Sequence, residues 1–192
     1  MKTKPAIRYL EDIKDVLYDQ SWAKTAPNFE IYYMHRGVKE KDDLRYDITI
    51  IPARMLGQEF VKTKGHYHVS FRQELYTVLS GQAIFLVQKT NKNKVEDIYA
   101  VKAKAGDVIV IPTGYGHITI NPSKEELKMA NWVSKKSKSD YSFIVKNHGA
   151  CYFALKKGRK IEWVINERYK DVPKLRFVKP SKSIPKDLTF LK

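Results

Sequence analysis

The stretch from Gly65 to Gly81 reads "GHYHVSFRQELYTVLSG" and places two histidines one residue apart behind a glycine. In a β-strand, residues i and i+2 point to the same face, so His66 and His68 would project together from one side of a sheet. Two imidazoles on one face can hold a metal ion, although such a pair in a β protein is more often incidental. The pair by itself leaves a metal site and a polar decoration of the strand both open.

A second stretch, from Gly106 to Asn121, reads "GDVIVIPTGYGHITIN" and adds a glycine and proline frame around His117. Between the two stretches, "TNKNK" separates two apolar runs and is typical of a hairpin loop. Taken singly, His117 could be a satisfied core histidine, and Glu74 could be a surface charge at the start of a strand. Their order and spacing relative to the first stretch favour a common site.

The composition indicates one folded domain with a basic surface. The chain has 192 residues, of which 43% are hydrophobic and 12% aromatic, enough for one core and too few residues for two ordinary domains. Its 36 lysines and arginines exceed its 21 acidic residues, which gives a net charge of +15. These basic residues are scattered, without zinc-finger spacing or an aromatic RNA-binding motif, so nucleic acid is not the expected partner. The charge could still help to gather a phosphorylated substrate.

The sequence also lacks the signals of membrane insertion and secretion. No apolar run approaches the roughly 20 residues that span a bilayer. The start, "MKTKPAIRYLEDIKD", has no apolar core like that of a secretory signal. We therefore expect a cytoplasmic protein with no membrane partner. The lone cysteine, Cys151, lies in an apolar run and is expected to be a buried, inert thiol.

The apolar pattern predicts one helix followed by many strands. Near the start, apolar residues recur three and four positions apart, which predicts an amphipathic helix. These residues are Leu10, Ile13, Val16 and Leu17. From "NFEIYYM" onward, short apolar runs such as "YDITIIPAR", "QAIFLVQKT" and "IEWVIN" alternate with turn signals. A β-sandwich or barrel follows, with a further hairpin at "KKGRK", where Gly158 suits a positive φ angle.

The two quoted stretches resemble the two motifs of the cupin superfamily. The first motif is matched with five residues between His68 and Glu74, where three or four is commoner, and the second is matched at every fixed position. The resemblance implies an all-β fold, the cupin double-stranded β-helix or jelly-roll barrel. We expect a short N-terminal helical segment over residues 1–28, the barrel over 29–170 and a basic C-terminal tail over 171–192.

The same resemblance implies a metal site inside the barrel. Three of its ligands would come from the first hairpin and the fourth from a strand brought alongside by closure of the barrel. The implied ligands are His66, His68, Glu74 and His117. Three imidazoles and one carboxylate suit Fe(II), Mn(II), Ni(II) or Zn(II) and leave positions for the oxygens of a substrate. One divalent ion per chain is expected, with Fe(II) as the first choice.

Within the superfamily, the chain most resembles the cupin-type glucose-6-phosphate isomerases of archaea, and "TKGHYH" is the most diagnostic match. The resemblance implies a metal-dependent interconversion of glucose 6-phosphate and fructose 6-phosphate, a step of glycolysis and gluconeogenesis. Glu74 is the best candidate base, although a hydride shift stays open because a metal ligand is a weakened base. The implied contacts to the substrate are Thr49, Thr63 and Gly65 at the phosphate, and Tyr76 and Tyr141 along the wall.

Some positions depart from that family or admit other interpretations. Ser139 stands where the family carries a site histidine, and Trp132 is interpreted as the replacement of a wall tyrosine. His148 is interpreted as a surface loop residue. Lys62 and Lys64 flank the clamp, and strand alternation predicts that they point away from the lumen.

These departures keep other functions open. The first alternative is an isomerase or epimerase of another sugar or sugar phosphate, and the second is a sugar-binding module without turnover. A cupin dioxygenase would use the same four ligands, whereas a nucleic-acid binder would depend on the basic tail. We further expect a homodimer, because cupins commonly pair through the edges of their sheets.

Overall fold

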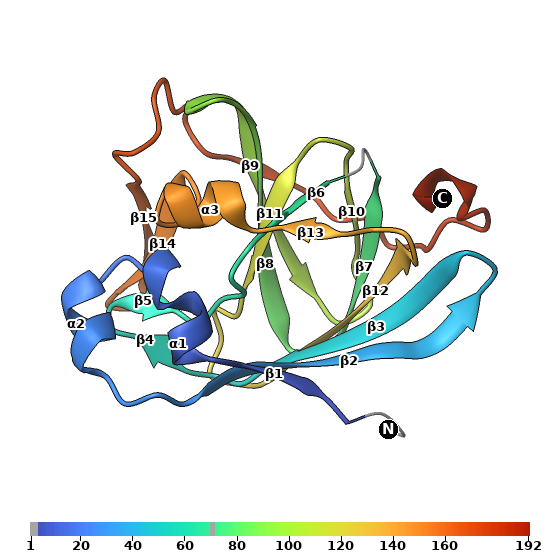
Figure 1. Ribbon diagram of the computed structural model, residues 1–192, viewed down its shortest axis with the longest axis horizontal. Coiled ribbons are helices and arrows are strands. Elements are labelled where there is room, and N and C mark those ends of the chain that lie inside the picture. Colours follow the sequence, from blue (N-terminus) through green and yellow to red (C-terminus); the bar gives the residue numbers. More distant parts are fainter. Residues whose placement is uncertain (1–3, 70–71) are drawn as a thin grey trace.

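The computed structural model describes residues 4–69 and 72–192, and strands dominate this part of the chain (Figure 1). The largest sheet has the strand order β1-β2-β3-β12-β7-β10, with antiparallel neighbours throughout. Its strands are β1 (Ala6–Tyr9), β2 (Glu30–Lys41), β3 (Leu44–Ile51), β12 (Leu127–Ser134), β7 (Glu74–Ser80) and β10 (Val108–Ile111). The late strand β12 lies between β3 and β7, so three segments distant in sequence form the middle of one sheet.

A second sheet packs against the first and has the order β11-β8-β9-β16. Its strands are β11 (Gly116–Ile120), β8 (Gln82–Asn91), β9 (Lys94–Lys104) and β16 (Arg176–Val178). Phe85 of β8 belongs to the core between the two sheets, whereas its neighbours Ile84 and Leu86 belong to a core on the outer face. Strand β8 is apolar along most of its length because both of its faces are buried.

A third sheet covers that outer face. It consists of β15 (Lys160–Ile165), β14 (Tyr152–Lys157), β5 (Glu59–Phe60) and β4 (Met55–Leu56). Both predicted hairpins are present, since β8 pairs with β9 and β14 with β15 around Gly158, whose φ is +60°. Cys151, just before β14, is buried as expected, and burial raises its pKa to about 12. The fold is therefore all-β, a jelly-roll sandwich as the sequence predicts.

The N-terminal helix differs from the prediction. The chain forms α1 (Leu10–Ile13), the 3-10 helix η1 (Lys14–Val16) and α2 (Gln20–Thr25) in place of one continuous helix. The helical run stops because the backbone of Leu17 is extended. The side-chain amide of Gln20 donates hydrogen bonds to the carbonyls of Lys14 and Leu17. The apolar residues that predicted the helix are nevertheless all buried. Neither β1 nor the short helix α3 (Ser142–Lys146) was expected.

The C-terminal tail lies along the body of the molecule (Figure 1). Strand β16 pairs in parallel with β9, Ser181 pairs with Val108, and Leu191 in the 3-10 helix η2 (Thr189–Leu191) is fully buried. Among the described residues, no helix is long and apolar enough to cross a membrane. The domain limits, the cytoplasmic location and the homodimer stay predictions, and residues 1–3 of the expected N-terminal segment lie outside the described residues.

Candidate metal centre

The ligand residues meet because the segment before β6 (Tyr67–His68) runs beside β11. His66 and His117 face each other across an antiparallel bridge, in which each backbone N–H donates to the other's carbonyl at 3.2 and 3.0 Å. Gly65 makes this approach possible, since its φ is +80° and a Cβ there would lie 2.3 Å from Cγ1 of Ile118. Glu74 reaches the same place as the first residue of β7.

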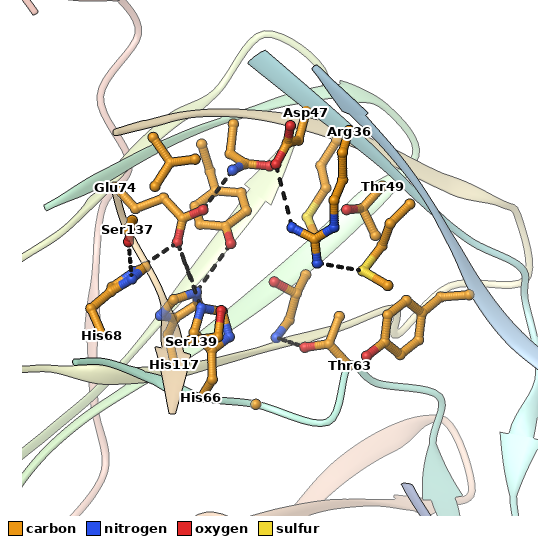
Figure 2. Close-up of a pocket in the computed structure, with 18 of the residues that line it drawn as sticks. Arg36, Asp47, Thr49, Thr63, His66, His68, Glu74, His117, Ser137 and Ser139 are labelled. Atoms are coloured by element: carbon orange, nitrogen blue, oxygen red, sulfur yellow. Dashed lines mark hydrogen bonds and ion pairs between the residues drawn. The ribbon is translucent and has the colours of Figure 1, made fainter. Parts of the chain in front are cut away.

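The four predicted ligands form one compact cluster (Figure 2). One ligand atom from each of them lies within 4.8 Å of the others. The carboxylate oxygen Oε2 of Glu74 lies 3.1 Å from Nε2 of His68, 3.3 Å from Nε2 of His117 and 4.0 Å from Nε2 of His66. Three imidazole nitrogens thus converge on a single carboxylate oxygen, which is a donor set that fits a divalent transition metal.

The protonation of the cluster also suits metal binding. Burial holds the pKa of His66 well below its ordinary value, and the neighbouring His117 lowers it further. Burial acts to raise the pKa of Glu74, but hydrogen bonds from His117 and His68 outweigh it and hold that pKa well below its usual range. A neutral imidazole and an ionised carboxylate are the forms in which these side chains bind metals.

Polar neighbours orient the ligand side chains (Figure 2). The amide of Asn131 donates to Oε1 of Glu74 at 2.5 Å, which leaves Oε2 for the imidazoles. The hydroxyl of Ser137 lies 2.7 Å from Nδ1 of His68, on the ring edge opposite the cluster. Such contacts fix the orientation and the tautomer of metal ligands.

The cluster opens into a pocket whose wall is built from alternate residues of three strands. On β2 these are Tyr32, Met34 and Arg36, on β3 Arg45, Asp47 and Thr49, and on β12 Met129, Asn131 and Val133. This period of two follows from the pleat, which turns residues i, i+2 and i+4 to the same face. All five predicted substrate contacts, Thr49, Thr63, Gly65, Tyr76 and Tyr141, line this pocket together with the ligands.

Two of these contacts have defined partners. The hydroxyl of Thr63 accepts the N–H of Thr119 at 3.0 Å, so its own hydrogen can point into the pocket. The phenol of Tyr76 lies 3.0 Å from Nε2 of His117. Burial, with Glu74 nearby, raises the pKa of Tyr76 well above 10, so this phenol keeps its proton at neutral pH.

The sequence did not single out the charged residues of the wall, Arg36, Arg45 and Asp47. Alternation along β3 could have found two of them, because Arg45 and Asp47 share the face of Thr49. Arg36 lies on another strand, and Gly37 beside it has a φ of +62° within an irregular stretch of the β2–β3 pairing. A glycine within a strand is the signal that could have marked this irregularity, and Gly37 was not interpreted in this way.

The ambiguous positions are now placed. Ser139 lines the pocket, as expected for the replacement of a site residue. The interpretation of Trp132 was wrong, because its neighbours in β12 face the pocket whereas its own ring packs against Tyr46. His148 lies at a different cavity, beside Tyr18 and Phe153.

The lysines that flank the clamp stand outside the pocket. Lys62 points away from it and forms a buried ion pair with Glu59 at 2.5 Å. The amino group of Lys64 lies 5.8 Å from the ring centre of Tyr141. The predicted orientation of Lys62 is therefore confirmed. The spacer between His68 and Glu74 includes residues 70 and 71, which lie outside the described residues.

Comparison with known proteins gives the same family from independent information. Residues 8–174 match the family model described as glucose-6-phosphate isomerase (GPI). The glucose-6-phosphate isomerase of Thermococcus onnurineus is 27% identical over 174 residues, which cover 87% of this chain and 88% of that protein. The enzyme of the same name from Thermococcus litoralis is 30% identical over 125 residues, covering 62% of this chain and 63% of that one.

Solved structures that match part of this chain include the formate complex of an oxalate decarboxylase from Lactobacillus farciminis. It has 22% sequence identity and a TM-score of 0.44, over 54% of this chain and 29% of that one. An oxalate oxidase with bound glycolate has 18% identity and a TM-score of 0.42, over 52% of this chain and 46% of that one.

The family match includes both histidine motifs, all four residues of the metal cluster and every residue of the pocket wall. The chain therefore belongs to the glucose-6-phosphate isomerase family, in its cupin form.

Proposed function

We propose that the protein is a metal-dependent isomerase that interconverts glucose 6-phosphate and fructose 6-phosphate. The observation that carries the proposal is the convergence of three imidazole nitrogens on one oxygen of Glu74, at the bottom of a pocket lined by hydroxyl groups. The relatives that match most of the chain are named glucose-6-phosphate isomerase, which supports the same substrate pair.

His66, His68, Glu74 and His117 would hold one divalent cation, and Fe(II), Mn(II), Ni(II) and Zn(II) all suit this donor set. When bound, such an ion supplies Lewis acidity, which withdraws charge from the sugar oxygens at C1 and C2. The chain contributes the geometry, because Asn131 and Ser137 already hold two of the ligand side chains in place.

The pocket around the cluster suits a phosphorylated sugar. We propose that the hydroxyls of Thr49 and Thr63 and the backbone N–H of Gly65 donate to the phosphate oxygens. Tyr76 and Tyr141 would orient the sugar hydroxyls with their phenol groups. Tyr76 keeps its proton over the neutral range and can serve as a hydrogen-bond donor there.

Isomerisation moves a hydrogen between C1 and C2 of the sugar. Glu74 is the residue that we propose to carry it as a proton, since its carboxylate lines the pocket that would receive the sugar and lies beside the imidazoles that would hold the metal. A direct hydride shift between the two carbons would leave Glu74 as a ligand without a proton-transfer role. Exchange of the C2 hydrogen with solvent deuterium distinguishes these routes, because only a carried proton can exchange.

The proposal is tested with a coupled assay for the conversion of fructose 6-phosphate to glucose 6-phosphate. The protein is stripped with chelator and reloaded in turn with Fe(II), Mn(II), Ni(II) and Zn(II). Turnover should depend on the metal and be lost in His66→Ala and Glu74→Ala, whereas His148→Asn, a histidine change outside the pocket, should keep it. Metal bound at the four ligands without turnover for any ion would contradict the proposed function.

A second candidate is an isomerase or epimerase of another sugar phosphate. It is favoured by the hydroxyl of Ser139 on the wall, where the family resemblance predicts an imidazole. A panel of aldose and ketose phosphates, assayed with the metal that gives the highest occupancy, separates the two. Binding of a sugar phosphate without turnover in the whole panel would indicate the non-catalytic module.

A further inference from the structure

Arg36 projects into the pocket from strand β2. It shares one face of the strand with Tyr32 and Met34, and all three line the pocket. Just after it, the β2–β3 pairing is irregular between His35 and Lys39, and the backbone N–H of Gly37 donates to Oδ1 of Asp47 at 2.8 Å. The irregular stretch is thus tied to the neighbouring strand, which fixes where Arg36 enters the pocket.

The other charged groups of the wall already have close partners. Asp47 is buried, and its Oδ2 accepts a hydrogen bond from Nε of Arg45 at 2.9 Å. Glu74 is enclosed by imidazoles and by the amide of Asn131. The carboxylates of the pocket are therefore largely compensated without Arg36.

The guanidinium of Arg36 has looser contacts. Its Nη1 lies 3.7 Å from Oδ2 of Asp47, which is longer than a direct N–H···O hydrogen bond. Its Nη2 donates to the sulfur of Met34 at 3.6 Å, and a thioether sulfur is a weak acceptor. Its side chain is 45% exposed, against 6% for Asp47. The guanidinium can therefore turn its N–H donors toward a ligand without breaking a strong contact within the protein.

The position of this charge matches the place where a phosphate is needed. In Figure 2 the guanidinium lies between Glu74 on one side and Thr49 and Thr63 on the other. The threonine hydroxyls are neutral donors, whereas a phosphate monoester carries a charge of about −1.5 to −2 at pH 7. A guanidinium supplies both the opposite charge and a planar pair of donors for phosphate oxygens.

We propose that Arg36 is the specificity-determining residue that anchors the substrate's phosphate and makes the pocket select phosphorylated over free sugars. The proposal rests on the proposed function of the same pocket. Asp47 and Arg45 act as positioning residues, since Asp47 links the Arg45 side chain to the backbone of the irregular stretch beside Arg36.

The test compares Arg36→Gln and Arg36→Lys with Arg54→Gln, which removes the same charge outside this pocket. Binding of fructose 6-phosphate and of fructose is measured by calorimetry on metal-loaded protein, and kcat and KM are measured for the phosphorylated sugar. Arg36→Gln should weaken binding of fructose 6-phosphate and raise KM by about 10- to 100-fold. Arg36→Lys should fall between, because it keeps the charge and loses the planar fork.

Fructose binding, metal content and the Arg54→Gln variant should stay at wild-type values. The inference would be overturned if the affinity of Arg36→Gln for fructose 6-phosphate were within twofold of the wild-type affinity. It would also be overturned if the variant lost as much affinity for fructose as for fructose 6-phosphate. A wild-type protein that binds the phosphorylated sugar through Arg36 but does not turn it over would support the inference while refuting the isomerase proposal. A wild-type protein that binds no sugar phosphate would overturn both.

Discussion

The buried ion pair between Lys62 and Glu59 predicts a large loss of stability when one partner is removed. The Lys62 and Glu59 side chains are 3% and 2% exposed, and their Nζ and Oε1 atoms are 2.5 Å apart. Lys62 also donates to the carbonyl of Val16, and Glu59 accepts the N–H of Tyr18. The pair therefore joins the N-terminal segment to the strand that leads into the histidine clamp.

Replacing Lys62 by methionine keeps most of the volume and leaves the Glu59 carboxylate buried without its cation. Breaking a buried pair in this way costs about 3–5 kcal/mol of folding stability, because water does not screen charges at this depth. For a protein of this size the melting temperature should fall by about 6–20 °C. The double variant Glu59→Gln with Lys62→Met should recover much of the loss, since the introduced amide is neutral and its oxygen can still accept the N–H of Tyr18.

The pH dependence of stability tests the same ion pair in a second way. Burial raises the folded-state pKa of Glu59 even in the wild type, where Lys62 and the Tyr18 amide oppose the rise, and loss of Lys62 must raise it further. A carboxyl with a raised folded pKa destabilises the fold above that pKa, and the cost fades as pH falls toward the unfolded pKa of about 4.3. The deficit of Lys62→Met relative to wild type should therefore be smaller at pH 5 than at pH 8.

Thermal unfolding followed by circular dichroism on metal-free protein measures these differences, with wild type, both single variants and the double variant compared at each pH. The metal-free state keeps changes in metal affinity out of the comparison. A Lys62→Met deficit under about 1 kcal/mol, or one that is equal at both pH values, would refute the reasoning.

Gly65→Ala should lower both the stability and the metal affinity, because the new Cβ would lie 2.3 Å from Cγ1 of Ile118. The control Gly114→Ala has a similar positive φ with open space around it, so it should show only the backbone strain of that φ. Equal metal affinity in the two alanine variants, measured by calorimetric titration, would refute the steric argument. Ser137→Ala should weaken metal binding by about 10- to 100-fold with little change in the stability of the metal-free protein, and unchanged affinity would contradict an orienting role. Leu191→Ala should destabilise the protein by about 2–5 kcal/mol in thermal unfolding, and unchanged stability would contradict the packing of the tail against the body.

The metal ligands could be named from the sequence because two of its stretches resemble known motifs, whereas strand alternation alone left the site open. Alternation along a strand turns His66 and His68 to one side, and the glycines and the one proline, Pro112, that frame His117 resemble a known motif. The strands were predictable because their apolar runs are long and bounded by turn signals. The strands depend on neighbours within a few residues along the chain, whereas the meeting of His66 with His117 depends on pairing between distant segments.

The features that were missed depend on pairing between distant strands. Arg36 enters the pocket where the β2–β3 register shifts, and Gly37 indicates a bulge there but does not determine which side chains the bulge turns toward the pocket. Trp132 was placed on the wrong face because an error of one residue in register moves a side chain to the other side of a sheet. The N-terminal helix was overextended because its apolar spacing is also satisfied when the helical run ends at Val16 and Leu17 is extended, with Leu10 and Leu17 both buried.

Register also explains why the central strand β12 matters for function although it supplies no metal ligand. Asn131 pairs with Asp47 of β3 on one side and with Tyr76 of β7 on the other, so three polar side chains form a row across the sheet. The amide in the middle of this row holds Oε1 of Glu74. A slip of β12 by one residue would bring Ala130 or Trp132 to that position, and neither could replace the amide that orients this carboxylate.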